Sequence, residues 1–365
     1  MSDSNTSAIE AVHVVQRMAP GGIETLVLDL VRTGGDGHRI ISLDGTTAEL
    51  IAGWPLLASI ADRVVGLDRG TGFSPLLSLR LGRRLRQMRP RAVVLHHVGP
   101  LLYGATAARL VGIKRIIHVE HDVWHYAAPR RRQLTRYIEA LCRPHHIAVS
   151  VDSARTLKQI LPKASITVIP NGIELDRFVP QARADARAAF GLPAGVTLIG
   201  TVGRLVSVKG HADLITAMSY LPDNISLVIA GDGAERAALE RQAKTTGVAN
   251  RIRFLGHVDE VERLLPAFDV FCLPSHSEGF PRSVIEAQAC NIPVVATDVG
   301  ALREAICPKS GRLSPARDPF ALAEAMREVL ASNSRTSPRR FIEARYSWSN
   351  TVAAYARVME ISHAA

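Results

Sequence analysis

Short apolar runs alternate with helical patterns along almost the entire chain. The runs are rich in β-branched residues and lie at residues 12–18, 40–43, 64–67, 92–96, 116–119, 147–149 and 166–169, and then at 198–202, 227–230, 252–255, 270–273 and 294–296. Between most of them, apolar residues recur at helical spacing, as in residues 24–31, 76–88, 101–111 and 133–142. Strands that alternate with helices predict parallel sheets covered on both faces. Two consecutive sets predict an α/β protein of two doubly wound domains, with ligands at the carboxyl ends of the strands.

The two sets meet at a turn, Pro170-Asn171-Gly172, and a charged stretch that runs to Arg187 reads as the linker. We therefore expect one domain at residues 8–172 and a second at 173–349. A last helical pattern, at about 350–363, carries an apolar stripe at helical spacing made of Val352, Tyr355, Val358 and Met359. Taken alone, this pattern is typical of a helix that caps the second domain.

Composition agrees with a globular protein of about two domains. The chain has 365 residues, 47% of them hydrophobic and 21% charged. No apolar run approaches the length needed to span a bilayer, and the first residues lack the pattern of a secretory signal. The cysteines are widely scattered without a Cys-x-x-Cys pair, which favours a reduced, cytoplasmic setting; they are Cys142, Cys272, Cys290 and Cys307.

The stretch at residues 277–287 carries the clearest chemistry. Glu278 directly precedes a Gly-Phe-Pro turn that contains Phe280, and Glu286 lies about a turn and a half into the helix that follows. The helix begins near a proline, so its first free N–H groups, around Ser283 and Val284, suit an anion such as a diphosphate. Since a carboxylate accepts two hydroxyl hydrogen bonds, the two glutamates suit a ribose and a hexose.

A second site of the same build precedes it in the same half of the chain. The apolar run at 198–202 leads into a glycine-bounded loop that carries Arg204 and Lys209, and a helical pattern follows. Arg204 can bind phosphate oxygens as a planar fork, and Lys209 acts as a compact point charge. Taken singly, either motif could be solvated loop charges, but two such loops in one predicted sheet favour a binding site.

Together these motifs resemble the retaining nucleotide-sugar glycosyltransferases of family 4, which have the GT-B fold. The resemblance spans nearly the whole chain, and the segments that carry it are Gly21-Gly22-Ile23-Glu24, Ile169-Pro170-Asn171-Gly172-Ile173, Gly203-Arg204, Lys209-Gly210, Gly231-Asp232-Gly233, Phe254-Leu255-Gly256-His257-Val258, Glu278 to Glu286, and Tyr346-Ser347-Trp348. It implies that the two domains face each other across a cleft, and that the last helix crosses back onto the first domain. It also implies transfer of a hexose with retention of configuration.

The resemblance and the motifs together give a set of expected site residues. A histidine at the His121 position lines the cleft near the donor sugar, and the loop with Gly22 touches the diphosphate or the acceptor. The expected catalytic residues are Arg204, Lys209, Glu278 and His121. The expected donor-binding residues are Gly22, Arg204, Lys209, Val258, Glu278, Phe280, Ser283, Val284 and Glu286. No cofactor is expected beyond the nucleoside diphosphate sugar, which is a co-substrate.

A histidine-rich segment at residues 118–125 admits a competing interpretation as a metal site. Its imidazoles, from His118, His121 and His125, could join a carboxylate from Glu120 or Asp122 around zinc. Residues along a strand alternate faces, however, so the spacing does not aim these rings at one ion. No Asp-x-Asp metal motif follows a strand in a suitable place, so we expect no essential metal ion. The cations at positions 204 and 209 would neutralise the diphosphate instead.

The net charge of +10 needs either a partner or a solvated surface. Arginines gather at positions 80, 83, 84, 86, 89 and 91, and again at 130–132. They suit a solvated helix face or an anionic inner membrane leaflet, each nearby cation being worth about 1 kcal/mol there. The second interpretation predicts a lipid-linked saccharide as acceptor and a peripheral position on the membrane. Nucleic acid is not expected as a partner, because no recognised module is present and aromatic residues make up 5%.

Three alternatives to this interpretation stay open. The acceptor could be a soluble small molecule, or the enzyme could be a sugar-nucleotide epimerase on a similar frame. An inactive scaffold subunit would be expected to have lost donor residues, whereas Arg204, Lys209, Glu278 and Glu286 are all present. A nicotinamide dehydrogenase is disfavoured because no G-x-G-x-x-G follows the first apolar run.

Overall fold

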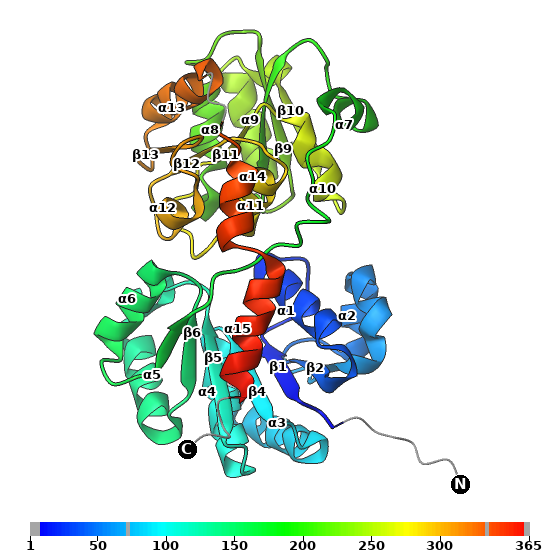
Figure 1. The fold of residues 1–365 in the computed structure, drawn as a ribbon, viewed down its shortest axis with the longest axis vertical. Coiled ribbons are helices and arrows are strands. Elements are labelled where there is room, and N and C mark those ends of the chain that lie inside the picture. The colour runs from blue at the N-terminus through cyan, green and yellow to red at the C-terminus, as the bar shows by residue number, and fades with distance from the viewer. Residues whose placement is uncertain (1–7, 71–73, 333–335, 361–365) are drawn as a thin grey trace. The chain divides into compact units, whose positions relative to one another are not determined.

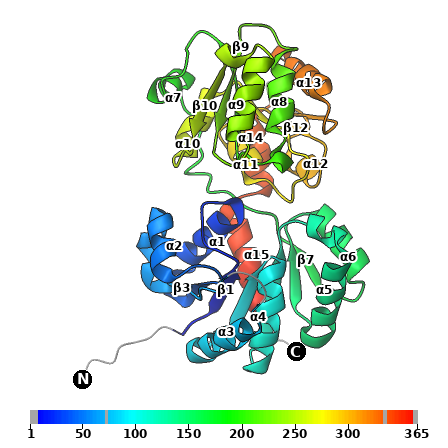
Figure 2. The same cartoon turned by 180° about the vertical axis from the view of Figure 1, so that it is seen from behind.

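The computed structural model describes residues 8–70, 74–332 and 336–360. The chain divides into two compact units: the first holds residues up to Pro170 together with those from Thr351 onward, and the second holds Asn171–Asn350. The division falls two residues before the expected one, which lay after Gly172. In each unit, helices cover both faces of one sheet (Figures 1 and 2).

The first unit is built on a seven-stranded parallel sheet in the order β3-β2-β1-β4-β5-β6-β7. Its strands are β1 Ala11–Val15, β2 His38–Ser42, β3 Val64–Gly66, β4 Ala92–His96, β5 Arg115–Glu120, β6 His145–Ala148 and β7 Ile166–Val168. Its helices are α1 Gly22–Thr33, α2 Thr47–Gly53, α3 Pro75–Met88, α4 Val98–Leu110, α5 Pro129–Cys142 and α6 Val151–Ile160. The central strands β1 and β4 are buried along their full length, as expected for a sheet covered on both faces.

The last helix, α15 (Trp348–Glu360), belongs to the first unit from Thr351 onward. Its Tyr355 and Val358 are almost fully buried, and the Arg115 guanidinium of β5 donates to the carbonyl of Val358 at 2.7 Å. Thr351 Oγ1 also donates to the Pro170 carbonyl at 3.0 Å. Residues 361–363 of the expected helix lie outside the described residues.

The second unit has a six-stranded parallel sheet in the order β10-β9-β8-β11-β12-β13. Its strands are β8 Thr197–Val202, β9 Ile225–Ala230, β10 Ile252–Gly256, β11 Val270–Leu273, β12 Val294–Thr297 and β13 Arg312–Ser314. Its helices are α7 Arg183–Ala189, α8 His211–Met218, α9 Arg236–Thr245, α10 Val261–Leu264, α11 Arg282–Ala289, α12 Leu302–Ala305, α13 Pro319–Ala331 and α14 Pro338–Arg345. The strand order changes direction beside β8, so the loops that follow β8 and β11 lie next to each other.

The charged stretch before Arg187 is not a linker throughout, because its last part forms α7. The Arg187 side chain is buried, and its guanidinium bonds Asp269 Oδ2 at 2.7 Å and the Ala267 carbonyl at 3.0 Å. This arginine therefore anchors α7 to the start of β11.

Among the described residues, no helix combines the length and the hydrophobicity that a membrane crossing requires.

Candidate active site

The loop after β8 brings Lys209 to the carboxyl end of the second sheet. The short helix η4 (Ser207–Lys209) ends at Gly210, which has a φ of +65°. A side chain at Gly210 would collide with the carbonyl oxygen of Pro274, which directly follows β11. The glycine therefore supplies both the left-handed backbone and the close approach that place Lys209 beside the β11 loop.

Lys209 and Glu278, predicted separately from two motifs, form an ion pair. Lys209 Nζ lies 2.6 Å from Glu278 Oε1, and the two side chains are 21% and 8% exposed. The hydroxyl of Ser275 donates to the same carboxylate oxygen at 2.5 Å. The ammonium group and the carboxylate thus lie together in a partly desolvated site, where hydrogen bonds to charged groups are strong.

The neighbouring strand β12 holds the loop that carries Glu278. Thr297 Oγ1 donates to the Ser275 carbonyl at 2.5 Å. Gly300, at φ +52°, passes so close to the Glu278 carbonyl that any side chain there would collide with it. The sequence motifs did not predict Ser275, Thr297 or Gly300, although a strand followed by a glycine loop and a helix recurs at 294–305 and could have signalled them.

Helix α11 begins directly after this loop with an uncapped end. Its N-cap residue is Pro281, which has no side-chain capping hydrogen bond, and Ser283 and Val284 lie in the first turn. The N-terminal amide groups of a helix attract anions when no side chain caps them. Glu286 lies one turn further, with its Oε1 3.5 Å from Arg282 Nε.

The remaining predicted donor residues are placed in different ways. Phe280 is buried against Tyr346, with ring centroids 5.2 Å apart, and its carbonyl accepts from Asn171 Nδ2 at 3.1 Å. Val258 is half-buried in the loop after β10. Arg204 is exposed in the loop after β8. The structure therefore joins Lys209 to Glu278 directly, while Arg204 stands in the same loop as Lys209.

In the first unit, Gly22 opens helix α1, and no side chain caps that helix at Gly21. A methyl group added at Gly22 would meet no atom within 4 Å, so the backbone there borders open space. A helix start of this kind lets a ligand come close to the backbone. The predicted role of Gly22 remains an expectation.

His121 follows β5 and is 6% exposed. Its Nε2 lies 3.1 Å from Nδ1 of His96. Burial, and then the nearby His97, lower the pKa of His121 to about 3. The ring is therefore neutral at ordinary pH and can offer one donor and one acceptor.

The three imidazoles considered for a metal site do not come together. His118 points to the other face of the sheet from His121 and pairs with His146, their Nδ1 atoms 3.1 Å apart. Within the part of the chain that the structure describes, three residues do have ligand atoms within 4.8 Å of one another. They are His97, Asp122 and His125, which we call the His97 cluster.

The His97 cluster is held by hydrogen bonds to one carboxylate. Asp122 Oδ2 lies 3.2 Å from His97 Nε2, and Asp122 Oδ1 lies 3.3 Å from His125 Nδ1. Burial alone would raise the pKa of Asp122, but the bonds from His125 and His97 hold it well below its usual range. His97 adopts a φ of +78°, an uncommon conformation for a residue with a side chain.

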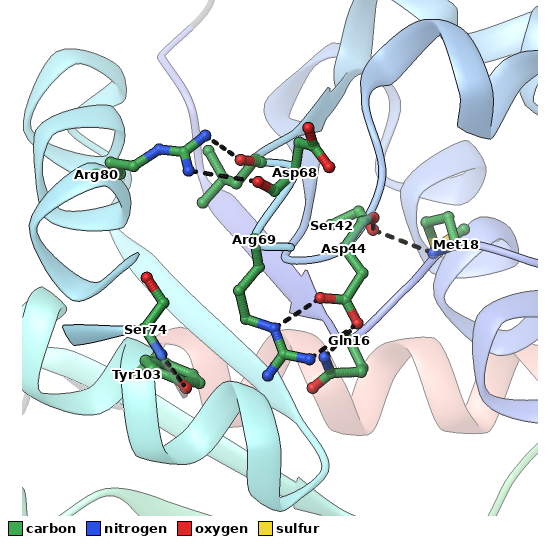
Figure 3. A network of polar contacts seen from close by, with 10 residues as sticks. Gln16, Met18, Ser42, Asp44, Asp68, Arg69, Ser74, Arg80 and Tyr103 are labelled. Carbon is green, nitrogen blue, oxygen red and sulfur yellow. Dashed lines mark hydrogen bonds and ion pairs between the residues drawn. The ribbon is translucent and has the colours of Figure 1, made fainter. Parts of the chain in front are cut away.

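A polar network ties together the loops at the carboxyl ends of β1, β2 and β3 (Figure 3). Asp44 is its centre: Gln16 Nε2 donates to Oδ2 at 2.5 Å, and Arg69 Nε donates to Oδ1 at 2.8 Å. Beside it, Arg80 of α3 donates to the carbonyls of Leu67 and Asp68. One arginine of the predicted basic face therefore has a structural role.

Comparisons with known proteins agree with this architecture. A family model described as glycosyl transferases group 1 matches residues 182–348, and one described as Glycosyltransferase Family 4 matches residues 20–177. EpsF of Bacillus subtilis, a protein named as a glycosyltransferase, is 29% identical over 313 residues that cover 80% of each chain. D-inositol 3-phosphate glycosyltransferase of Mycolicibacterium gilvum is 38% identical over 199 residues, 52% of this chain and 45% of that protein. This chain thus aligns with about half the length of that relative.

Solved structures show the same fold at lower sequence identity. HepE of Anabaena, crystallised with UDP and glucose, has a TM-score of 0.85 at 20% identity and covers 97% of this chain and 100% of its own. Sucrose-phosphate synthase of Thermosynechococcus elongatus has a TM-score of 0.81 at 22% identity and covers 96% of this chain and 98% of its own. The chain therefore belongs to the family 4 glycosyltransferases, with two Rossmann-like domains of the GT-B fold.

Proposed function

We propose that this protein moves a hexose from a nucleoside diphosphate sugar to a saccharide acceptor, with retention of configuration. The second unit binds the donor, and the first binds the acceptor. The observation that carries this proposal is the Lys209–Glu278 ion pair, 2.6 Å long, beside the uncapped start of α11. A cation, the amide groups of a helix start that no side chain caps, and a carboxylate at one strand end match a diphosphate joined to a sugar.

The proposed chemistry rests on stabilising the diphosphate as it leaves. Lys209 and Arg204 place positive charge where negative charge develops when the glycosidic bond breaks, which is usually the largest single catalytic contribution. Glu278 accepts hydrogen bonds from the hexose, and Glu286 accepts them from the ribose. The acceptor hydroxyl attacks on the face that the diphosphate leaves, and the departing phosphate takes its proton. In the first unit, we propose that His121 and Gly22 contact substrate.

Known relatives support a uridine nucleotide as one candidate donor. HepE of Anabaena was crystallised with UDP and with UDP-glucose, and TarM of S. aureus with UDP and a saccharide. Their identities to this chain are 16–21%, so they guide the choice of donors to test rather than the assignment.

We further propose that the reaction needs no metal ion. Two cations, Arg204 and Lys209, are available to neutralise the diphosphate, which is the task a divalent ion performs elsewhere. The His97 cluster, by contrast, already pairs its two imidazoles with the Asp122 carboxylate.

The acceptor is proposed to be a lipid-linked saccharide, reached from the cytoplasmic face of the membrane. Helix α3 buries Leu77, Leu81 and Leu85 and exposes Leu76 and Leu79 at 66% and 65%. The exposed leucines lie on the same helix as several exposed arginines, which are Arg80, Arg83, Arg84 and Arg86. Apolar groups among cations suit an anionic lipid surface.

Transfer of label decides between this function and its alternatives. The purified chain is incubated with a nucleotide sugar labelled in the hexose, with and without saccharide and lipid-linked acceptors. Label found in the acceptor, with the anomeric configuration of the donor, supports retaining transfer. An altered sugar still attached to the nucleotide supports the epimerase, and transfer only to a soluble acceptor removes the lipid-linked proposal.

A further inference from the structure

Four buried histidines of the first unit stand in one diagonal row on one face of the sheet. From β2 to β1 to β4 to the end of β5, each histidine lies two residues further toward the carboxyl ends than the one before, in the order His38, His13, His96 and His121. The strand pairs that fix this are Ala11 with His38, His13 with Val94, and His96 with Val119. Steps of two residues keep every side chain on the same face.

Hydrogen bonds join neighbouring rings of this histidine row, and every bond uses the same pair of ring nitrogens. His38 Nδ1 lies 3.1 Å from His13 Nε2, His13 Nδ1 lies 3.0 Å from His96 Nε2, and His96 Nδ1 lies 3.1 Å from His121 Nε2. Neighbouring rings are stacked with centroids 5.3–5.4 Å apart. Every link thus joins the Nδ1 of one ring to the Nε2 of the next.

All four rings are held in the neutral form. Burial lowers the pKa of His13 and His96 well below the usual value, and lowers that of His38 against the opposing charge of Glu10. The pKa of His121 is about 3. A neutral imidazole has one N–H donor and one acceptor nitrogen. Each inner ring must therefore donate to one neighbour and accept from the other.

Because every hydrogen bond joins the Nδ1 of one ring to the Nε2 of the next, only two arrangements of the ring protons satisfy all the hydrogen bonds of the row. Either all four protons lie on Nδ1, and His121 presents an N–H to its surroundings, or all four lie on Nε2, and His121 presents an acceptor. Any mixture of the two tautomers leaves at least one pair of facing ring nitrogens with two protons or with none, which is unfavourable for buried polar groups. The tautomers of the four rings are therefore coupled.

The two ends of the histidine row lie in different surroundings. The His121 end neighbours His97 and Asp122 at the carboxyl edge of the sheet. The His38 end lines a hollow of about 220 Å³ together with Glu10, Arg91 and residues of α15. His38 fits there because position 34 is glycine: a methyl group at Gly34 would overlap the imidazole.

We propose that His38, His13 and His96 are positioning residues that decide whether His121 donates or accepts a hydrogen bond at the substrate. When the ring protons move from Nδ1 to Nε2, His121 releases its Nδ1 proton to its surroundings and His38 takes up a proton on Nε2 from solvent. Each of the other Nδ1 protons passes to the Nε2 of the next ring, in the order His38, His13, His96 and His121. The net charge of the row is unchanged. This inference rests on the proposed contact between His121 and the substrate. It adds that His38, at the amino end of β2, influences how His121 makes that contact.

Nitrogen-15 NMR of the full-length protein, labelled at histidine and free of ligand, tests the coupling directly. Protonated and unprotonated ring nitrogens have well-separated shifts, so each tautomer can be read. We expect His38, His13, His96 and His121 to carry their protons on the same nitrogen. Any one of the four with its proton on the other nitrogen overturns the proposal, and this result does not depend on catalysis.

Kinetics test whether the coupling reaches the reaction. His38→Phe keeps an aromatic ring but can neither donate nor accept, and we expect turnover to fall about tenfold, the factor that one ordinary hydrogen bond represents. His38→Asn retains a donor and an acceptor, and it should restore turnover to within about twofold of the wild type. Equal turnover in the Phe and Asn variants would overturn the proposal, because a purely structural role predicts no such difference.

A second pair of variants avoids the histidines altogether. Gly34→Ala pushes on the His38 ring and should alter the ring-nitrogen shifts of His121, whereas Gly53→Ala, where nothing lies within 4 Å of the added methyl group, should not. Unchanged His121 shifts in Gly34→Ala would count against the coupling. If the tautomers agree and yet no nucleotide sugar is used, the proposed function fails and the histidine row stands.

Discussion

Replacing Lys209 by alanine is the most informative single perturbation of the proposed mechanism. The ammonium lies 2.6 Å from Glu278 Oε1, in a place where the two side chains are 21% and 8% exposed. Its loss removes a positive charge from the proposed diphosphate and leaves the Glu278 carboxylate to repel that diphosphate. Losing one preorganised stabiliser costs about 2.7–4 kcal/mol in the transition state, so turnover should fall about 10²-fold or more.

The same substitution also has a cost in stability, which must be separated from its effect on catalysis. Solvent reaches the ammonium, so we expect a loss of about 1–3 kcal/mol rather than the larger cost of breaking a fully buried pair. For a domain of this size the melting temperature would drop by about 2–4 °C per kcal/mol. The variant should therefore remain folded at assay temperature, which calorimetry can check.

Initial rates of nucleotide release at saturating donor and acceptor give the required comparison. Lys163→Ala, which removes an exposed lysine of the first unit, is the matched control and should behave as wild type. Lys209→Arg should recover only part of the activity, because a planar fork does not replace a point charge. Near-normal turnover in Lys209→Ala would refute the proposed stabilisation of the leaving diphosphate.

Four further results are expected. Glu286→Gln should weaken nucleotide binding by about 1.5–3 kcal/mol, whereas Glu278→Gln should mainly lower turnover; unchanged UDP and GDP binding in calorimetry of Glu286→Ala would contradict the assignment. Activity should survive excess chelator, and elemental analysis should find no stoichiometric zinc at the His97 cluster. The protein should sediment with anionic vesicles at low salt and be released as the Debye length shrinks from ~10 Å at 0.1 M to ~3 Å at 1 M, and reversing Arg83 and Arg84 to Glu should abolish binding. Because burial lowers the pKa of His121 to about 3, unfolding binds protons, and chemical denaturation should show stability falling as pH drops below about 6.5.

The sequence predicted the class of fold because the spacing of apolar runs is set by secondary structure. Runs at 92–96 and 270–273, for example, became the buried strands β4 and β11. The ends of the elements differ from the apolar runs: the run at 12–18 predicts one strand, whereas β1 ends at Val15 and the chain then turns toward Asp44. An apolar residue such as Met18 continues a run in sequence, but it packs in a loop.

The candidate site was predictable where local motifs carry the chemistry. Lys209 and Glu278 were recognised from their own loops, but their direct contact depends on which strands are neighbours, and periodicity does not reveal strand order. The histidine row shows the same limit. His38, His13, His96 and His121 are far apart in sequence, and only the register of three strand pairs places them on one face.

Thermal-shift measurement against UDP, GDP and ADP sugars tests the central claim most directly, because a ligand that binds only the native state stabilises it. At about 100 times its dissociation constant a donor should add about 2.7 kcal/mol, which corresponds to roughly 5–10 °C in the melting temperature of the second unit. We predict such a shift for at least one of these sugars, and a clearly smaller one in Lys209→Ala and Glu286→Ala. No shift with any nucleotide sugar, or an equal shift in wild type and both variants, would contradict donor binding at this site.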